Sequence, residues 1–363
     1  MQRRHINPAF TRKRIQDLYP LFWTKSKGLI DALTSNNWHR PDKPEKSVDI
    51  CKWMSRATLD IIGIAGMGQE FNAVQHPDSG LYQTYQTLFK PRQIARRLTK
   101  QFYLLRSLGH QANLPFRYPA CKGQPPAPNA EGSSLLFIAL ACGGFTDDDL
   151  VSQLMSFLIA GHETTASALS WCIVMVCKRP EMQAKPRDEL RSGLPNPRTN
   201  FHSVNANEFD TLPCLNVICN ETLRLFSPAP LTIRVAAKDT GLFDHVIPKG
   251  TPIFIHPCAV NLSRDLWGHD AMEWNPERWI GNMRNNNSGR ATSNQAFLTF
   301  LQGERRCIGE GFAKGEMKVL LAALVSTFEM ESVEGGKGDV KDGFTAKPNG
   351  LFVKLGVVNE DSG

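Results

Sequence analysis

The residues with the clearest chemical potential lie near the C-terminal end, in the run Phe-Leu-Gln-Gly-Glu-Arg-Arg-Cys-Ile-Gly at positions 300–309. Cys307 follows a loop that contains Gly303, and Gly309 precedes an expected helix. The N–H groups and dipole of a helix N-terminus stabilise a thiolate, and glycines allow close approaches that a Cβ would block. Arg305 can reach an anion. This pattern suits a large planar metal cofactor with acidic groups, and a loop cysteine before an amphipathic helix explains it equally well.

A second polar group interrupts an expected apolar helix, with Ala-Gly-His-Glu-Thr-Thr at positions 160–165. Gly161 costs about 1 kcal/mol relative to alanine in a helix, and a threonine hydroxyl that bonds to the i−4 carbonyl can bend the helix. An acid beside an alcohol, Glu163 and Thr164, suggests proton delivery to a bound ligand. A satisfied polar kink is the simpler alternative. His162 does not begin an HExxH motif, which excludes a zincin protease.

The third group pairs an acid with an arginine three positions later, Glu221 and Arg224. Such i,i+3 pairs are common on exposed helix faces, but the surrounding residues here are apolar and favour burial. A buried arginine needs more than one partner. Arg278, in the aperiodic region that follows, is a candidate second arginine for this group.

Most of the chain has helical periodicity, and strands are expected only late. Thr146 as N-cap and Asp149 three residues later predict the start of the longest helix. Residues 107–134 hold five prolines within fourteen positions and are expected to be irregular. The expected helices cover residues 49–71, 146–178, 208–226 and 308–329, and the expected strands cover residues 231–235 and 252–255, joined through a turn at 248–250.

Composition limits the function classes. The 363 residues are 41% hydrophobic and 21% charged, which excludes wholesale disorder, and no apolar run is long enough to span a membrane. Nine cysteines without a CxxC pair give no zinc-site spacing. The net charge is +7, but no motif that stacks on bases or reads a groove accompanies it, so nucleic-acid binding is disfavoured. The basic run at 90–106 suits a solvated helix face, an acidic partner or anionic lipid.

Taken together and in this order, the three groups resemble the cytochrome P-450 haem-thiolate monooxygenases. Residues 300–309 match the haem-binding pattern FxxGxRxCxG of that family at every fixed position, and residues 160–165 match its oxygen-activation motif. Glu221, Arg224 and Arg278 match its ExxR-plus-arginine triad, which is structural. The resemblance covers about residues 2–330, apart from the proline-rich segment. The motif style is similar to that of microsomal, fungal members.

The resemblance implies a mainly α fold, in which a large helical domain carries small β-sheets, with a single catalytic core over residues 1–358. It implies haem b as cofactor and Cys307 as the axial ligand of its iron. Glu163 and Thr164 would deliver protons, Arg305 and Arg234 would bind the haem propionates, and Arg3 would match the arginine of the WxxxR motif. The other residues expected to contact the cofactor are Phe300, Gly303, Gly309 and Ala160.

The implied activity is insertion of one oxygen atom of O2 into a lipophilic small molecule, in secondary or xenobiotic metabolism. The implied electron donor is an NADPH-dependent flavoprotein reductase. Apolar residues expected near the pocket, Ala160, Ala229, Pro230 and Leu231, suit a lipophilic substrate. A full-length relative is expected at the cytosolic face of the endoplasmic reticulum membrane. This chain, without the membrane anchor, is expected in the cytoplasm.

Some features depart from the family pattern. The chain begins inside the expected third helix, so the first strands and N-terminal helices are missing, and residues 107–134 replace the roof helices. Glu304 stands where microsomal relatives have proline, and Pro186 lies inside an expected helix. These departures leave open an inactive or unfolded truncated remnant as the alternative. A peroxide-using or rearranging relative is disfavoured by the Glu163–Thr164 pair, and a non-haem helical interaction protein by Cys307 and Arg305.

Overall fold

The computed structural model describes residues 3, 6–35, 47–80, 82–83, 134, 146–194, 204–280, 289–333, 340–341 and 345–358. Apart from Ser134, the proline-rich segment lies outside the described residues. The helices are α2 (Arg12–Gln16), α3 (Tyr19–Thr34), α4 (Ile50–Ile62), α8 (Asp147–Lys178), α9 (Glu181–Gly193), α10 (Ala206–Asp210), α11 (Pro213–Leu225), α12 (Pro257–Asn261), α13 (Arg264–Trp267) and α14 (Glu310–Thr327). The strands are β1 (Ser47–Asp49), β2 (Thr232–Val235), β3 (Thr240–Leu242), β4 (His245–Ile247), β5 (Pro252–Ile255), β6 (Phe328–Ser332), β7 (Val340–Lys341), β8 (Lys347–Pro348) and β9 (Phe352–Val357). Single turns of 3-10 helix are η1 (Asn7–Phe10), η4 (Pro276–Trp279) and η5 (Gly303–Arg305), and η3 (Gly63–Met67) is a π-helical turn.

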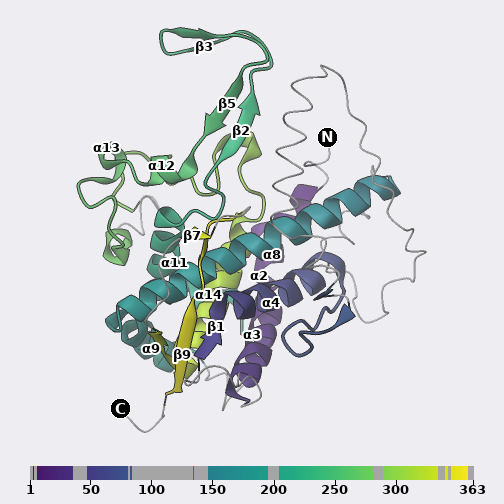
Figure 1. Cartoon of the computed structure of the whole chain (residues 1–363), viewed down its shortest axis with the longest axis vertical. Helices are drawn as coiled ribbons and strands as arrows, with labels where there is room; N and C mark the ends of the chain where they lie inside the picture. The colour runs from purple at the N-terminus through teal and green to yellow at the C-terminus, as the bar shows by residue number, and fades with distance from the viewer. Residues whose placement is uncertain are drawn as a thin grey trace.

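Helix α8 crosses the molecule from one side to the other (Figure 1). Its 32 residues give it a length of about 48 Å at 1.5 Å per residue. The predicted start is confirmed, because Thr146 accepts a hydrogen bond from the backbone N–H of Asp149 and the Asp149 side chain accepts one from the backbone of Thr146. This capping box fixes the register of the helix and therefore the face on which residues 160–165 lie.

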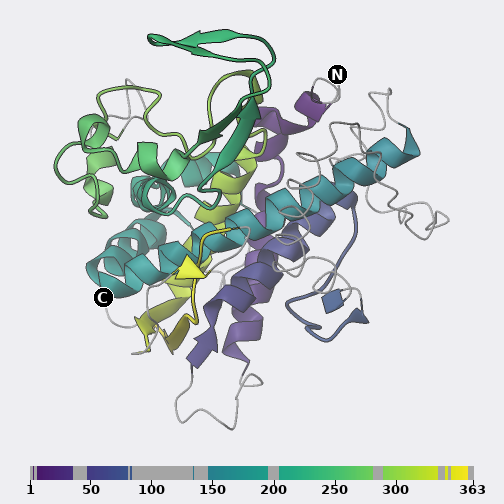
Figure 2. The same ribbon diagram turned by 45° about the horizontal axis from the view of Figure 1, so that its top comes forward.

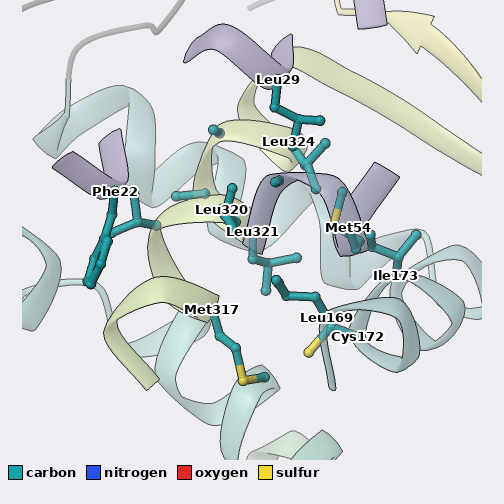
Figure 3. Packing of buried hydrophobic residues seen from close by; sticks show 14 of the residues in the cluster. Phe22, Leu29, Met54, Leu169, Cys172, Ile173, Met317, Leu320, Leu321 and Leu324 are labelled. Atoms are coloured by element: carbon teal, nitrogen blue, oxygen red, sulfur yellow. The ribbon is translucent and has the colours of Figure 1, made fainter. Parts of the chain in front are cut away.

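Helices α3, α4, α8 and α14 enclose the main apolar core. Leu169 and Ile173 of α8 lie close to Met54 of α4, while Leu320 and Leu321 of α14 extend toward them (Figure 3). All of these side chains are fully buried. Close packing of this kind holds α8 and α14 at a fixed separation, and the candidate site lies between them.

The sheets are small and antiparallel. Strands β1, β9 and β6 form a three-stranded sheet in that order, and β2 pairs with β5 over four residue pairs. The β3–β4 hairpin follows β2 in the chain and extends away from the helices (Figure 2). Helices with small sheets confirm the expected fold class. Among the described residues, no helix is both long and apolar enough to cross a membrane.

Three predicted element boundaries were wrong. The expected helix 49–71 is α-helical only as far as Ile62. It continues as the π-helical turn η3 to Met67, and residues 68–71 are not helical. The expected helix 208–226 is divided into α10 and α11, because Pro213 lacks the N–H that would continue the first helix and instead begins the second. The expected helix 308–329 ends at Thr327, and the chain continues as β6.

The other element predictions were close to the structure. The two expected strands are present as β2 and β5, but the hairpin β3–β4 lies between them in the chain, and Gly250 at φ +86° forms the turn into β5. Pro186 lies inside α9 without ending that helix.

Candidate active site

Cys307 lies at the end of a tight loop that runs into α14. The backbone N–H of Cys307 donates to the carbonyl of Phe300 at 2.7 Å, which closes the loop around η5. Gly303 has φ +77°, a left-handed conformation that a side chain would strain, so glycine is required here. The Cys307 side chain is exposed, and the free space it faces is the cavity between α8 and α14.

Although Cys307 opens onto the cavity, the protein around its sulfur displaces water and raises the pKa of the thiol above its ordinary value, and a hydrogen bond with the backbone of Gly309 opposes the rise. The negative charge of Glu310 raises it further, whereas the positive charges of Arg3 and Arg306 lower it. The protein alone therefore does not make Cys307 a free thiolate. Coordination to a metal cation would deprotonate it.

The cavity has a volume of about 1140 Å³. Ala160 and Thr164 of α8 line one side, and Ala313 and Met317 of α14 line another. Strand β2 and the residues that precede it complete the wall, and Cys307 and Arg305 come from the loop before α14. Most of the side chains that line the cavity are apolar, and threonines are the main exceptions. The cavity therefore suits a large planar apolar group that is bound through one sulfur atom.

The side chains of residues 160–165, the predicted oxygen-activation motif, face in two directions. Ala160 and Thr164 share the face of α8 that lines the cavity, and the Thr164 hydroxyl donates to the Ala160 carbonyl at 2.5 Å. Glu163 is not among the residues that line the cavity. Its carboxylate pairs with Lys347 of β8 and lies 3.4 Å from Nδ1 of His162. Thus the predicted acid and alcohol are neighbours, and only the alcohol faces the cavity.

His162 is fully buried and joins α8 to α4. Its Nε2 is 2.8 Å from the hydroxyl of Ser55, and its carbonyl accepts a hydrogen bond from Thr58 at 3.2 Å. Burial lowers the pKa of His162 to about 4, while Glu163 opposes the shift and Lys347 adds to it. His162 is therefore neutral near pH 7.

Glu221, Arg224 and Arg278 meet in a fully buried cluster. The Glu221 carboxylate accepts from Arg224 at 2.9 and 2.8 Å and from Nε of Arg278 at 3.0 Å. It also accepts from Nε1 of Trp279 and from the backbone N–H of Asn275, each at 2.9 Å. The remaining N–H groups of Arg224 donate to carbonyls of residues 261, 271 and 273. This cluster ties α11 to the aperiodic region.

The arginines expected near an acidic cofactor group have different positions. Arg305 lines the cavity. Arg3 lies close enough to Cys307 for its charge to lower the pKa of that thiol. Arg234 is exposed, and its guanidinium donates to the Thr232 hydroxyl at 2.9 Å and to the Ile233 carbonyl at 3.0 Å. Arg234 does not line the cavity, although its neighbours Thr232 and Ile233 do.

The donor set fits an iron porphyrin. A single accessible thiol faces an apolar cavity, with Arg305 placed to neutralise a carboxylate. In the part of the chain that the structure describes, no group of three or more histidine, cysteine or acidic side chains could hold a bare metal ion. The accessible thiol at the wall of an apolar cavity suits a single thiolate ligand to a metal that a macrocycle already holds.

Several residues that complete the site were not predicted from the sequence. Lys347 and Ser55 contact the α8 motif from distant parts of the chain, and Trp279 completes the Glu221 cluster. Glu316 of α14 is buried near Thr165 of α8, and burial raises the pKa of its carboxyl group. Local spacing contains no signal for these contacts. An acid at an otherwise apolar helix position was the only available sign for Glu316.

Comparison with known proteins gives a consistent result. The family described as Cytochrome P450 matches residues 135–355. Cytochrome P450 monooxygenase sphH of Aspergillus fumigatus is 38% identical, with 98% of this chain aligned to 69% of that protein. Cytochrome P450 monooxygenase FUM15 of Gibberella moniliformis is 37% identical over 91% of this chain and 66% of its own length. The crystal structure of the cytochrome P450 CYP102L1 superposes with a TM-score of 0.75 at 25% identity, covering 98% of this chain and 77% of that one.

Proposed function

This chain belongs to the cytochrome P450 family, and from that premise we propose that Cys307 is the thiolate ligand of its haem iron, in the cavity between α8 and α14. The protein is a haem-thiolate monooxygenase of the fungal type associated with secondary metabolism, and its cofactor is haem b. When bound, haem b supplies the activation of dioxygen, of which one oxygen atom enters the substrate and the other becomes water. The accessible thiol of Cys307 in an apolar cavity is the observation that carries the proposal.

The loop before α14 would hold the cofactor. The Gly309 backbone bonds to the Cys307 sulfur, and donors of this kind stabilise a thiolate once the metal has displaced its proton. Phe300 and Ala160 would contact the macrocycle from two sides, because both line the cavity. Gly303 and Gly309 would leave room for the loop to pass close to it. A Cβ at Gly309 would lie 4.0 Å from the sulfur.

Three arginines would bind the carboxylates of the cofactor. Arg305 already lines the cavity, and Arg3 lies near Cys307. Arg234 would need only a change of its side-chain rotamer, since the adjacent residues of β2 line the cavity and the Arg234 side chain is exposed. Arginine suits this role because its planar guanidinium binds a carboxylate through two parallel hydrogen bonds.

Glu163 and Thr164 would deliver protons. The Thr164 hydroxyl lies at the cavity wall, and its hydrogen bond to Ala160 leaves its oxygen free to accept a proton donor. Glu163 is partly exposed and can exchange protons with solvent. An adjacent acid and alcohol can therefore move a proton from solvent to the cavity, as general acid catalysis requires.

The Glu221, Arg224 and Arg278 cluster would be structural, because it is buried and none of the three lines the cavity. We also propose that residues 1–358 form one catalytic core. The cavity is built from α8, α11, β2, the Cys307 loop and α14, which are spread over much of that length.

The substrate we propose is a lipophilic small molecule, since Ala229, Leu231 and Ile233 add an apolar wall to the cavity. The family uses a reductase as electron partner, and we propose that it is an NADPH-dependent flavoprotein. Three exposed cations on α2, Arg12, Lys13 and Arg14, provide a surface for an acidic protein near the start of α14. For a full-length relative, we propose the cytosolic face of the endoplasmic reticulum membrane as the location.

The decisive experiment is the absorption spectrum of the reduced, CO-bound protein after expression with haem supplied. The wild-type chain should show the strongly red-shifted Soret band that a thiolate opposite CO produces. C307A should lose that band, whereas C214A, which removes a thiol on α11 away from the cavity, should keep it. A red-shifted band in C307A, or no haem uptake by the wild type, would overturn the proposal.

A further inference from the structure

Residues 345–348 lie across α8 and are held to it by several hydrogen bonds. The carbonyl of Ala346 accepts from the Ser167 hydroxyl and from Nε1 of Trp171, each at 2.7 Å. The Ala346 N–H donates to the carbonyl of Pro228 at 3.1 Å. The neighbouring residue, Lys347, is therefore presented to α8 by a backbone whose position is fixed on both sides.

Lys347 uses this position to pair with the acid of the α8 motif. Its ammonium group contacts Oε2 of Glu163, and both side chains are more than three-quarters buried. Nδ1 of His162 also lies near the Glu163 carboxylate, at 3.4 Å. His162 is neutral near pH 7 and carries no compensating charge. Lys347 is thus a cation in direct contact with the Glu163 carboxylate and compensates its charge.

The ion pair lies beside the cavity wall. Residues 160 and 164 share the cavity face of α8, and residue 163 is turned by about 100° from residue 164 because of the helical repeat. The Glu163 carboxylate is therefore held on the neighbouring face of α8, where Lys347 contacts it, one residue before Thr164. A partly buried carboxylate without a countercharge would instead take up a proton or turn toward solvent.

We propose that Lys347 is a positioning residue for oxygen activation, which fixes the Glu163 carboxylate on the face of α8 that adjoins the cavity wall. The inference rests on the proposed role of Glu163 in proton delivery. It adds a residue from the C-terminal β8 strand to a function otherwise confined to α8. Lys347 need not contact substrate or cofactor, because it acts through Glu163.

The test is a double-mutant cycle on the holoenzyme with E163Q, K347M and the double variant. The reaction uses a flavoprotein reductase, NADPH and 7-ethoxycoumarin as probe substrate, and it measures the hydrogen peroxide released per NADPH oxidised. We expect K347M and E163Q each to raise peroxide release by roughly two- to tenfold, and the double variant to release no more than E163Q, since coupled residues are non-additive. K347R, which keeps the charge, should stay near wild type.

A second readout does not depend on activity. Urea unfolding of the same four proteins should give non-additive losses for Lys347 and Glu163, whereas S167A, which weakens the 345–348 contact without changing a charge, should destabilise the wild type and E163Q equally. Additive effects in both readouts would overturn the proposal. If E163Q raises peroxide release and K347M does not, this proposal alone fails. If E163Q has no effect, the proposed role of Glu163 also fails.

Discussion

Glu221 accepts five hydrogen bonds from four residues, Arg224 on its own helix and Asn275, Arg278 and Trp279 in the aperiodic region. Two arginines face this one carboxylate, and Asp270 supplies the second negative charge at 2.9 Å from Arg278. The buried charges are therefore balanced, and carbonyl oxygens satisfy the remaining N–H groups of Arg224. Removal of one partner leaves a buried charge uncompensated. The loss of any member therefore lowers the free energy of unfolding, even where the intact ion pair contributes little net stability.

We expect E221A to lower the free energy of unfolding by about 3–5 kcal/mol, since two buried guanidinium groups lose their carboxylate. The measurement is urea unfolding followed by far-UV circular dichroism. K185A is the matched control. It breaks an exposed ion pair with Glu277 at 3.3 Å and should cost less than about 1 kcal/mol. A similar decrease in the free energy of unfolding in the two variants would show that burial does not make the Glu221 cluster more important for stability than an exposed ion pair.

His162 should make the stability of the protein sensitive to acid. Its pKa of about 4 in the fold lies below the ordinary value of 6.5, so only the unfolded chain takes up a proton between these values. Above about pH 6.5, His162 is neutral in both states and does not change the free energy of unfolding. As the pH falls from 6.5 toward 4, protonation of the unfolded chain lowers that free energy. Linkage gives a loss of about 2 kcal/mol between pH 6.5 and 5 from this group.

The variant H162Q keeps a hydrogen-bonding side chain beside Ser55 and cannot titrate. The unfolding free energy of the wild type should therefore fall more steeply between pH 6.5 and 5 than that of H162Q. H245Q, at an exposed histidine of the β3–β4 hairpin, should keep the wild-type slope. Parallel pH profiles for the wild type and H162Q would show that His162 is not a buried neutral group.

At the scale of elements, the sequence predicted what local patterns determine and missed what contacts between distant segments determine. The start of α8 follows from Thr146 and Asp149, which lie three positions apart, and it was predicted correctly. The end of α4 depends on Phe71, which folds back against Gly63. The three chemical groups were likewise visible in short motifs, whereas Lys347 reaches Glu163 only through the tertiary fold.

Gly63 permits the π-helical turn that ends α4. A Cβ there would lie 2.4 Å from the Phe71 ring and 2.8 Å from the Gln69 carbonyl, and the backbone oxygen cannot move without displacing the loop. We expect G63A to cost about 2 kcal/mol or more, as overpacked sites do. G66A lies in the same turn, where the nearest atom is Ile62 Cδ1 at 3.7 Å, and it should be tolerated. Thermal unfolding of both variants tests this, and equal melting temperatures would contradict it.

At the scale of the whole molecule, the position of charge matters more than its sum. The net charge is +7, and Arg12, Lys13 and Arg14 gather on one short exposed helix. Helix α2 packs against the first turns of α14, where a Cβ on Gly311 would lie 3.8 Å from Ile15. Because α14 follows Cys307 directly, this basic surface lies near Cys307, the proposed thiolate ligand. An acidic electron donor attracted there would be held close to the Cys307 loop.

The double variant K13E/R14E should therefore lower kcat/KM for the reductase by roughly tenfold at low ionic strength, because electrostatic steering governs the association rate. The CO-bound spectrum should not change.

K238E/K249E is the control, since it places the same charge change on exposed residues beside the β3–β4 hairpin. Each reversal changes the charge by two, so both double variants fall from +7 to +3. Rates are measured across a range of salt concentrations, because screening should remove the difference between the wild type and K13E/R14E at high salt. Equal losses in the two double variants would mean that the total charge of the molecule, and not the α2 surface, attracts the electron donor.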